Sequence, residues 1–107
     1  MNKKILILGH GYVGDYLYNR LKYLLNYDVT IVKREFLDYT DSSKVERWLT
    51  EKRDHFNYII NCSGFTGRPN VDEGEKKPEL CYELNTFTPL RISNLCKTYG
   101  INYIHIS

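Results

Sequence analysis

The 107-residue chain is 42% hydrophobic and 26% charged, with a formal net charge of +2 at pH 7. This length suits one domain with a hydrophobic core, and the composition is that of a soluble globular protein rather than a disordered one. The small net charge predicts neither a nucleic-acid partner nor a membrane partner. The first apolar run, residues 5–8, is far shorter than the roughly 7–15 residues of a signal-peptide core. We therefore expect a cytoplasmic protein.

The potential metal ligands of the chain have no metal-site spacing. Cys62, Cys81 and Cys96 lack a Cys-x-x-Cys pattern, and we expect them to be reduced residues that pack in the core. The three histidines, His10, His55 and His105, are scattered along the sequence. No metal site is predicted.

Short apolar runs alternate with helical patterns along the whole chain. Strands are predicted over Lys3–Leu8, Val29–Val32, Tyr58–Cys62 and Tyr103–Ile106. Helices are predicted over Val13–Leu25, Lys44–Lys52 and Pro78–Tyr99. The strands are nearly continuous in Ile, Leu and Val, as expected when helices cover both faces of a parallel sheet. The predicted fold class is therefore α/β, a Rossmann-type doubly wound parallel sheet in three α/β/α layers.

The first strand runs directly into the turn at residues 9–14, Gly-His-Gly-Tyr-Val-Gly, and then into a helical pattern. A Gly-x-Gly-x-x-Gly turn in this setting is typical of a dinucleotide site, although a glycine-rich turn without a ligand is the alternative. Gly9 allows a sharp turn, Gly11 allows the backbone to approach a pyrophosphate, and Gly14 allows the helix to pack closely. The N–H groups at the start of the helix then face the phosphates. The predicted cofactor-binding residues here are Gly9, Gly11, Tyr12, Val13 and Gly14.

In the first helix, apolar residues recur every three or four positions and predict the buried face. These residues are Val13, Leu17, Leu21 and Leu24. Further along, Ser43 and Glu46 predict a capping box for the second helix. Pro89 predicts that the last helix kinks or restarts near Thr88, and Gly100 is expected to end it.

Lys33 and Arg34 follow the second strand, where an NAD site usually has an acidic residue that binds the ribose. A guanidinium and an ammonium favour a 2′-phosphate, so both residues are predicted to bind NADP. Glu35 keeps NAD possible, because a small error in the strand end would place its carboxylate at the ribose. A solvated basic loop is the remaining alternative. Asp38 is predicted to accept a hydrogen bond from the adenine amino group, or else to cap a helix.

With these motifs, the chain resembles the extended short-chain dehydrogenase/reductase family, in particular the dTDP-4-dehydrorhamnose reductases and related epimerase-reductases of nucleotide-rhamnose synthesis. The resemblance covers essentially the whole chain. It rests on residues 9–14, on Leu-Asp-Tyr-Thr-Asp at 37–41, on Ile-Ile-Asn-Cys-Ser-Gly-Phe-Thr at 59–66, on Gly-Arg-Pro-Asn-Val-Asp at 67–72 and on Glu-Leu-Asn at 83–85.

The resemblance implies further contacts with the cofactor. Cys62, Ser63 and Gly64 would lie beside the pyrophosphate and the nicotinamide ribose, and Thr66 near the nicotinamide. Asn85 resembles a helix asparagine that points toward the cofactor, although a surface or kink-capping asparagine is the alternative.

The family's catalytic Tyr-x-x-x-Lys pair is missing at the corresponding place. Tyr18 and Lys22 have this spacing, but they belong to the first helix, where we expect them on the solvent side and not in catalysis. We expect the catalytic residues beyond Ser107, so that residues 1–107 are an NAD(P)-binding domain truncated before the catalytic pair and the sugar-binding domain. The parent protein is expected to be an NAD(P)-dependent oxidoreductase, and this chain alone to be inactive.

The expected function is the dinucleotide-binding portion of a reductase of nucleotide-linked 4-keto-6-deoxy sugars. One alternative is a non-catalytic NAD(P)-binding regulatory module, and another is the same portion of a nucleotide-sugar epimerase or dehydratase. The last predicted strand would leave an unpaired sheet edge, which predicts self-association.

Overall fold

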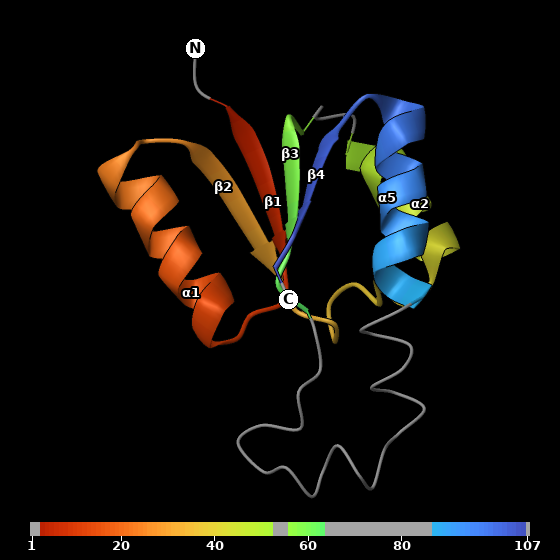
Figure 1. The fold of residues 1–107 in the computed structure, drawn as a ribbon, viewed down its shortest axis with the longest axis horizontal. Coiled ribbons are helices and arrows are strands. Elements are labelled where there is room, and N and C mark those ends of the chain that lie inside the picture. The colour runs from red at the N-terminus through yellow and green to blue at the C-terminus, as the bar shows by residue number, and fades with distance from the viewer. Residues whose placement is uncertain (1–2, 53–55, 64–86, 107) are drawn as a thin grey trace, which may run out of the picture.

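The computed structural model describes residues 3–52, 56–63 and 87–106 (Figure 1). Its elements are β1 (Lys4–Leu8), α1 (Tyr12–Asn19), the π-helical η1 (Arg20–Leu24), β2 (Asp28–Val32), α2 (Ser42–Lys52), β3 (Tyr58–Asn61), α5 (Thr88–Tyr99) and β4 (Asn102–His105). The predicted residues outside the described ranges are Gly64, Thr66, Cys81 and Asn85, and the predicted helical residues 78–86 also lie outside them.

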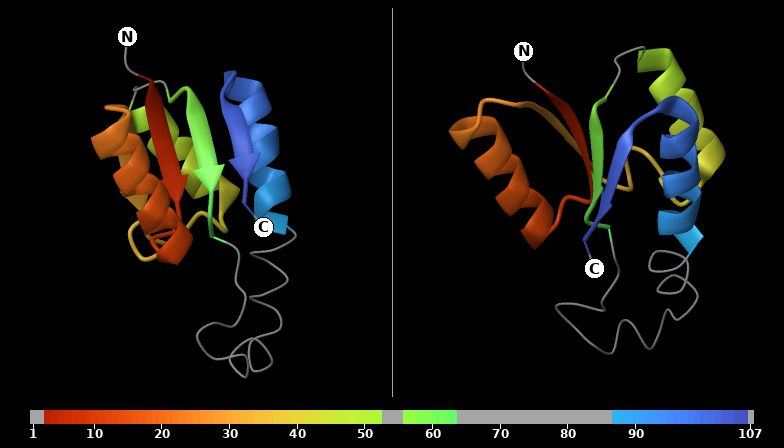
Figure 2. Two further views of the ribbon diagram at one scale, coloured as in Figure 1. Left: turned by 60° about the vertical axis from the view of Figure 1, so that its left-hand side comes forward. Right: turned by 45° about the horizontal axis from the view of Figure 1, so that its top comes forward.

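The described strands form one parallel sheet in the order β2-β1-β3-β4. Figures 1 and 2 show α1 on one face of this sheet and α2 and α5 on the other. The predicted fold class, a doubly wound parallel sheet in three layers, is confirmed. All four strands point the same way, so their carboxyl ends share one edge, which is where open α/β sheets carry their ligand sites.

Side chains alternate between the two faces of β1 and enter two separate hydrophobic cores. Leu6 and Leu8 pack on the side of α2 and α5, where their partners include Val45 and Ile92. Ile5 and Ile7 pack on the side of α1, against Leu17, Leu21 and other side chains. Burial on both faces explains why the strands are uninterrupted apolar runs.

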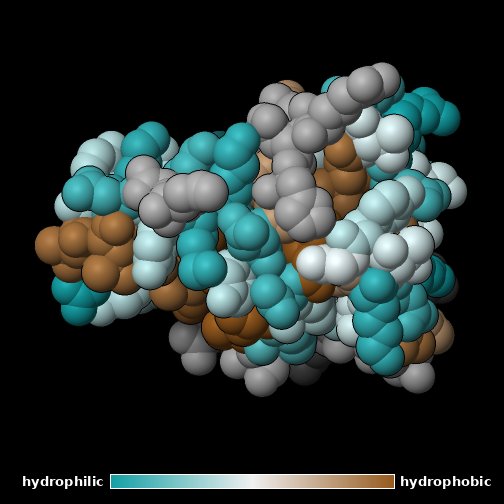
Figure 3. Space-filling model, turned by 90° about the horizontal axis from the view of Figure 1, so that it is seen from above, coloured by the Kyte–Doolittle hydropathy of each residue, from teal (hydrophilic) through white to brown (hydrophobic). Residues whose placement is uncertain are grey.

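The prediction for the buried face of the first helix is wrong at both ends, because Val13 is 44% exposed and Leu24 is 64% exposed. At the first turn Gly14 faces the sheet, since a Cβ there would lie 2.1 Å from the Gly9 carbonyl oxygen. Beyond Asn19 the helix widens into η1, and this change of period turns the last residues away from the core. Hydrophobic surface therefore appears at the end of the molecule that carries η1 (Figure 3).

Tyr18 is half-buried against the α1-side core, which corrects its predicted place on the solvent side. The buried stripe consists of Gly14, Leu17, Tyr18 and Leu21. This stripe still follows helical spacing and keeps Leu17 and Leu21 of the predicted one, whereas Gly14 and Tyr18 take the places of Val13 and Leu24.

The predicted capping box at Ser43 is also wrong, because α2 begins earlier and Ser43 lies inside its first turn. The capping side chain is Asp41, whose Oδ1 accepts a hydrogen bond of 3.0 Å from the Ser43 N–H. The other terminal signals are confirmed. Helix α5 begins at Thr88 with Pro89 in its first turn, and Gly100 ends it in the left-handed region at φ 69°.

Candidate functional site

The carboxyl-end pocket

A pocket of about 340 Å³ lies where the glycine turn after β1, the segment after β2 and the end of β3 meet. Its lining residues are Gly9, His10, Gly11, Lys33, Arg34, Glu35, Tyr39, Cys62 and Ser63. We call it the carboxyl-end pocket. It brings together residues from three segments that are far apart in the sequence, and most of them were predicted to bind a cofactor.

The three glycines of the turn differ in what the fold requires of them. Gly9 has φ +104°, and a Cβ on it would lie 3.0 Å from the backbone of Cys62 and Ser63. Gly14 has no room for a Cβ either, because of the Gly9 carbonyl. Gly11 has an extended backbone, with φ −115° and ψ −160°, and a Cβ on it would meet nothing within 4 Å. The fold therefore explains Gly9 and Gly14, whereas Gly11 borders open space in the pocket.

Helix α1 points its N-terminus at this space. Gly11 is its N-cap residue and has no capping side chain, and the Asp15 N–H makes a helical hydrogen bond of 2.9 Å to the Gly11 carbonyl. The N–H groups of the preceding residues in the first turn have no intrahelical acceptor, as at any helix start. The Tyr12 and Val13 side chains are exposed and do not line the pocket, so a contact with phosphate would use their backbone N–H groups.

His10 reaches from the glycine turn to the first turn of α1. Its Nε2 lies 2.6 Å from Asp15 Oδ1. This contact pairs the Asp15 carboxylate in the first turn of α1 with the imidazole of a residue that lines the pocket.

Three charged side chains follow β2 into the pocket. The carbonyl of Lys33 accepts hydrogen bonds of 3.0 Å from the N–H groups of Phe36 and Leu37, so the chain turns tightly here. This turn gathers Lys33, Arg34 and Glu35 around one cavity. Both the cations expected for NADP and the carboxylate expected for NAD therefore line the pocket.

Asp38 does not line the carboxyl-end pocket. Its Oδ1 accepts a hydrogen bond of 3.1 Å from the Thr40 N–H and another from the Thr40 hydroxyl. The side chain borders a neighbouring hollow that also contains Lys44 and Arg47. Asp38 thus shapes the turn that leads to α2 and does not cap that helix, and its contact with adenine stays a prediction.

Tyr39 lines the pocket and was not predicted to do so. It is 6% exposed, and burial raises the pKa of its hydroxyl. The sequence signal for Tyr39 was its place in the Leu-Asp-Tyr-Thr-Asp segment, in which Asp38 was the residue predicted to bind the cofactor.

The end of β3 forms the opposite wall. The Cys62 N–H donates to the Leu8 carbonyl at 2.8 Å, which ties this wall to β1. Cys62 is half-buried, and burial raises the pKa of its thiol. Asn61 precedes it, is fully buried and holds Ser63 through its side chain, a role that the sequence analysis missed.

Other regions

Tyr18 and Lys22 lie in α1 and η1, and neither lines the carboxyl-end pocket. The Lys22 ammonium donates a hydrogen bond of 2.8 Å to the Tyr18 hydroxyl, and this bond raises the pKa of Lys22. The described residues contain no group of three or more metal-ligating side chains, and none of their helices has the length and hydrophobicity to cross a membrane.

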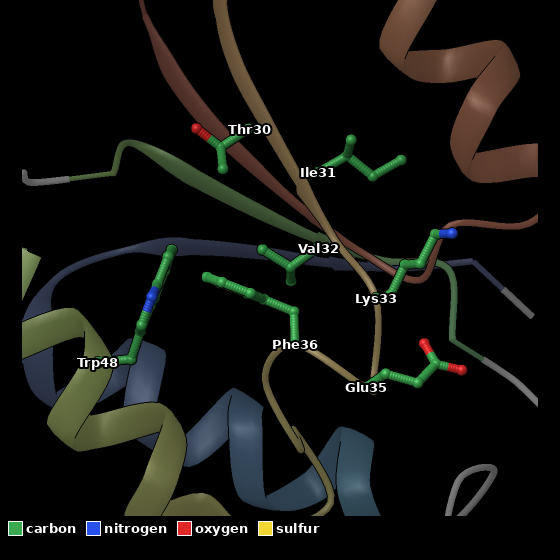
Figure 4. Close-up of a pocket in the computed structure, with 7 residues that line it drawn as sticks. All are labelled: Thr30, Ile31, Val32, Lys33, Glu35, Phe36 and Trp48. Carbon is green, nitrogen blue, oxygen red and sulfur yellow. The ribbon is translucent and has the colours of Figure 1, made fainter.

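A larger groove of about 560 Å³ lies along the outer edge of β2 (Figure 4). Its lining residues are Thr30, Ile31, Val32, Lys33, Glu35, Phe36 and Trp48. Apolar side chains dominate this β2-edge groove, and it contains neither the glycine turn nor the helix N-terminus. The carboxyl-end pocket is therefore the candidate site.

Comparison with known proteins

A family model described as the RmlD substrate binding domain matches residues 3–107. dTDP-4-dehydrorhamnose reductase from Bacillus anthracis, solved in complex with NADP, is 27% identical, with a TM-score of 0.81 over 100% of this chain and 36% of that chain. A dTDP-4-dehydrorhamnose reductase from Clostridium acetobutylicum is 29% identical, with a TM-score of 0.76 over 94% of this chain and 34% of that chain.

UDP-rhamnose synthase from Acanthamoeba polyphaga mimivirus has the same fold, with 23% identity and a TM-score of 0.80 over 98% of this chain and 37% of that chain. The search of curated proteins finds no match. The chain spans about a third of the length of the two reductases. The resemblance to dTDP-4-dehydrorhamnose reductases is confirmed, and the chain belongs to the RmlD substrate binding domain family.

Proposed function

We propose that this chain binds NADP(H) in the carboxyl-end pocket and is the dinucleotide-binding portion of a reductase that acts on a nucleotide-linked 4-keto-6-deoxy sugar. The observation that carries the proposal is Gly11, where a Cβ would project into open space beside the N-terminus of α1. Protein packing gives no reason for a glycine there, whereas the close approach of a pyrophosphate does. The NADP in the reductase from Bacillus anthracis supports the same choice of ligand.

Successive parts of NADP(H) would contact different residues around the pocket. The N-terminus of α1 would receive the pyrophosphate, and Lys33 and Arg34 would receive the 2′-phosphate. Because β1 lies between β2 and β3, the rest of the cofactor would extend past Cys62 and Ser63. NADPH, when bound, supplies a hydride, and the role of these residues is to bind and orient it.

The activity of the whole protein is part of the proposal. The nucleotide-sugar substrate is suggested by the two reductases, of which this chain matches only about a third. We propose that Tyr18 and Lys22 do not supply the proton for the sugar carbonyl, since neither residue lines the pocket.

Fluorescence titration with NADPH tests the site. Gly11→Val should keep the circular dichroism spectrum of the wild type, because its Cβ has free space, but should weaken NADPH binding by at least about tenfold, or 1.4 kcal/mol. Gly14→Ala is the control for damage to the fold, and it should lose the native spectrum and binding together. Equal affinity of Gly11→Val and the wild type would contradict the proposal.

A further inference from the structure

Two residues behind the carboxyl-end pocket form a hydrogen-bonded connection to one of its walls. Asn61 is fully buried at the end of β3, and its Nδ2 donates a hydrogen bond of 3.0 Å to the hydroxyl of Tyr103 on β4. Its Oδ1 accepts a hydrogen bond of 2.9 Å from the Ser63 N–H and another from the Ser63 hydroxyl. The connection therefore runs from β4 through a buried amide to a residue that lines the pocket.

The donors and acceptors fix the direction of this amide. The Ser63 N–H is a donor, so the oxygen end of the Asn61 amide must face it. The nitrogen end must then face Tyr103, whose hydroxyl oxygen accepts the bond. Without that hydroxyl, the buried Asn61 N–H would lose its partner, which is costly enough to favour a rearrangement of the side chain.

The peptide between Cys62 and Ser63 transmits such a rearrangement to the site. It packs against the glycine turn so closely that a Cβ on Gly9 would lie 3.0 Å from its atoms. Cys62 and Ser63 also line the pocket themselves. A shift of this peptide would change the wall of the pocket that Cys62 and Ser63 form.

The surroundings of Tyr103 hold its side chain in place as the hydrogen-bond acceptor of Asn61. It packs against the core on the side of α2 and α5, and its ring stacks with that of His105 at 6.5 Å between centroids. Burial raises the pKa of its hydroxyl to about 12, so the group remains neutral at ordinary pH.

We infer that Tyr103 is a positioning residue for the cofactor, which acts through Asn61 to hold the Cys62–Ser63 peptide against the half of the dinucleotide beyond the pyrophosphate. The inference rests on the proposed function. It assigns to a residue outside the pocket a part in binding one half of the ligand and not the other.

The test compares two ligands, NADPH and adenosine 2′,5′-bisphosphate, which contains the 2′-phosphate but lacks the nicotinamide half. Tyr103→Phe should raise the Kd for NADPH by about threefold to tenfold, the usual worth of one hydrogen bond, and should leave the Kd for the bisphosphate unchanged. Tyr58→Phe, on the strand that carries Asn61, is the matched control and should change neither Kd.

An unchanged Kd for NADPH in Tyr103→Phe would overturn the inference, and so would an equal loss of affinity for both ligands. A wild-type chain that binds neither ligand would instead contradict the proposed function, and the inference with it. The double variant Tyr103→Phe/Ser63→Ala adds a second criterion. Because both side chains act through the same amide, their effects on NADPH binding should be less than additive, and additive effects would overturn the connection.

Discussion

At the scale of single residues, the glycine turn separates what the fold needs from what a ligand needs. Gly9 and Gly14 have no room for a side chain, whereas Gly11 has room and borders the carboxyl-end pocket. A sequence motif treats the three glycines alike. The structure assigns two of them to packing and leaves the third for the ligand.

Some residues of the carboxyl-end pocket and its surroundings could be predicted from the sequence, and others could not. Those that line the pocket are Gly9, Gly11, Lys33, Arg34, Cys62 and Ser63. The two glycines, Lys33 and Arg34 were predicted from strand ends, which apolar runs make easy to locate, and Cys62 and Ser63 from the family resemblance. Tyr39 and Asn61 were missed because their roles depend on burial and on partners distant in the sequence, such as Tyr103.

The choice between NADP and NAD depends on the charges after β2. Arg34→Ser should weaken NADPH binding by about tenfold, the worth of a charge-assisted hydrogen bond, and should leave NADH binding nearly unchanged. Glu35→Gln is the matched variant, and it should not weaken NADH binding. Titration of both variants with both cofactors would contradict this assignment if Arg34→Ser left the preference unaltered and Glu35→Gln weakened NADH.

At the scale of elements, the predicted bounds lie within two residues of the described ones, except at the start of the last helix, which was predicted at residue 78 and falls outside the described residues. What they missed are local details set by tertiary contacts. The π-helical turn η1 carries Leu24 away from the core, and the contact between Gly14 and Gly9 sets the rotation of α1. Neither feature has a periodic signature in the sequence.

The start of α2 offers a test at this scale. Asp41→Ala should lower the free energy of unfolding by about 1 kcal/mol, because Asp41 accepts a hydrogen bond from the first turn. For a domain of this size that corresponds to a decrease in Tm of roughly 4–8 °C. Ser43→Ala is the control, and calorimetry should show little change. If Ser43→Ala lowered the free energy of unfolding more than Asp41→Ala did, Ser43 and not Asp41 would be the residue that caps α2.

At the scale of the whole molecule, one face of the described sheet is covered by a helix near β2 but not near β4. Helix α1 lies against β1 and β2, away from β4 (Figures 1 and 2). Tyr103 packs on the side of α2 and α5, so Ile104 lies on the other face, where it is 41% exposed. An edge strand with exposed apolar residues favours pairing with another chain.

We therefore expect the chain to self-associate through β4 at high concentration, and Ile104→Lys to shift it toward the monomer. Sedimentation velocity over a series of concentrations measures this. Phe36→Ser, in the β2-edge groove, is the control. If the wild type stays monomeric throughout the series, or if Phe36→Ser is the variant that dissociates it, association through β4 is wrong.

The central claim is that a dinucleotide binds at the carboxyl ends of β1, β2 and β3. The most direct measurement is a two-dimensional amide NMR spectrum of the isotope-labelled chain during titration with NADPH. We predict that the largest shifts occur at the amides of Gly11, Val13, Arg34 and Ser63. Shifts confined to the β2-edge groove around Phe36 and Trp48, or no shifts at all, would contradict the account.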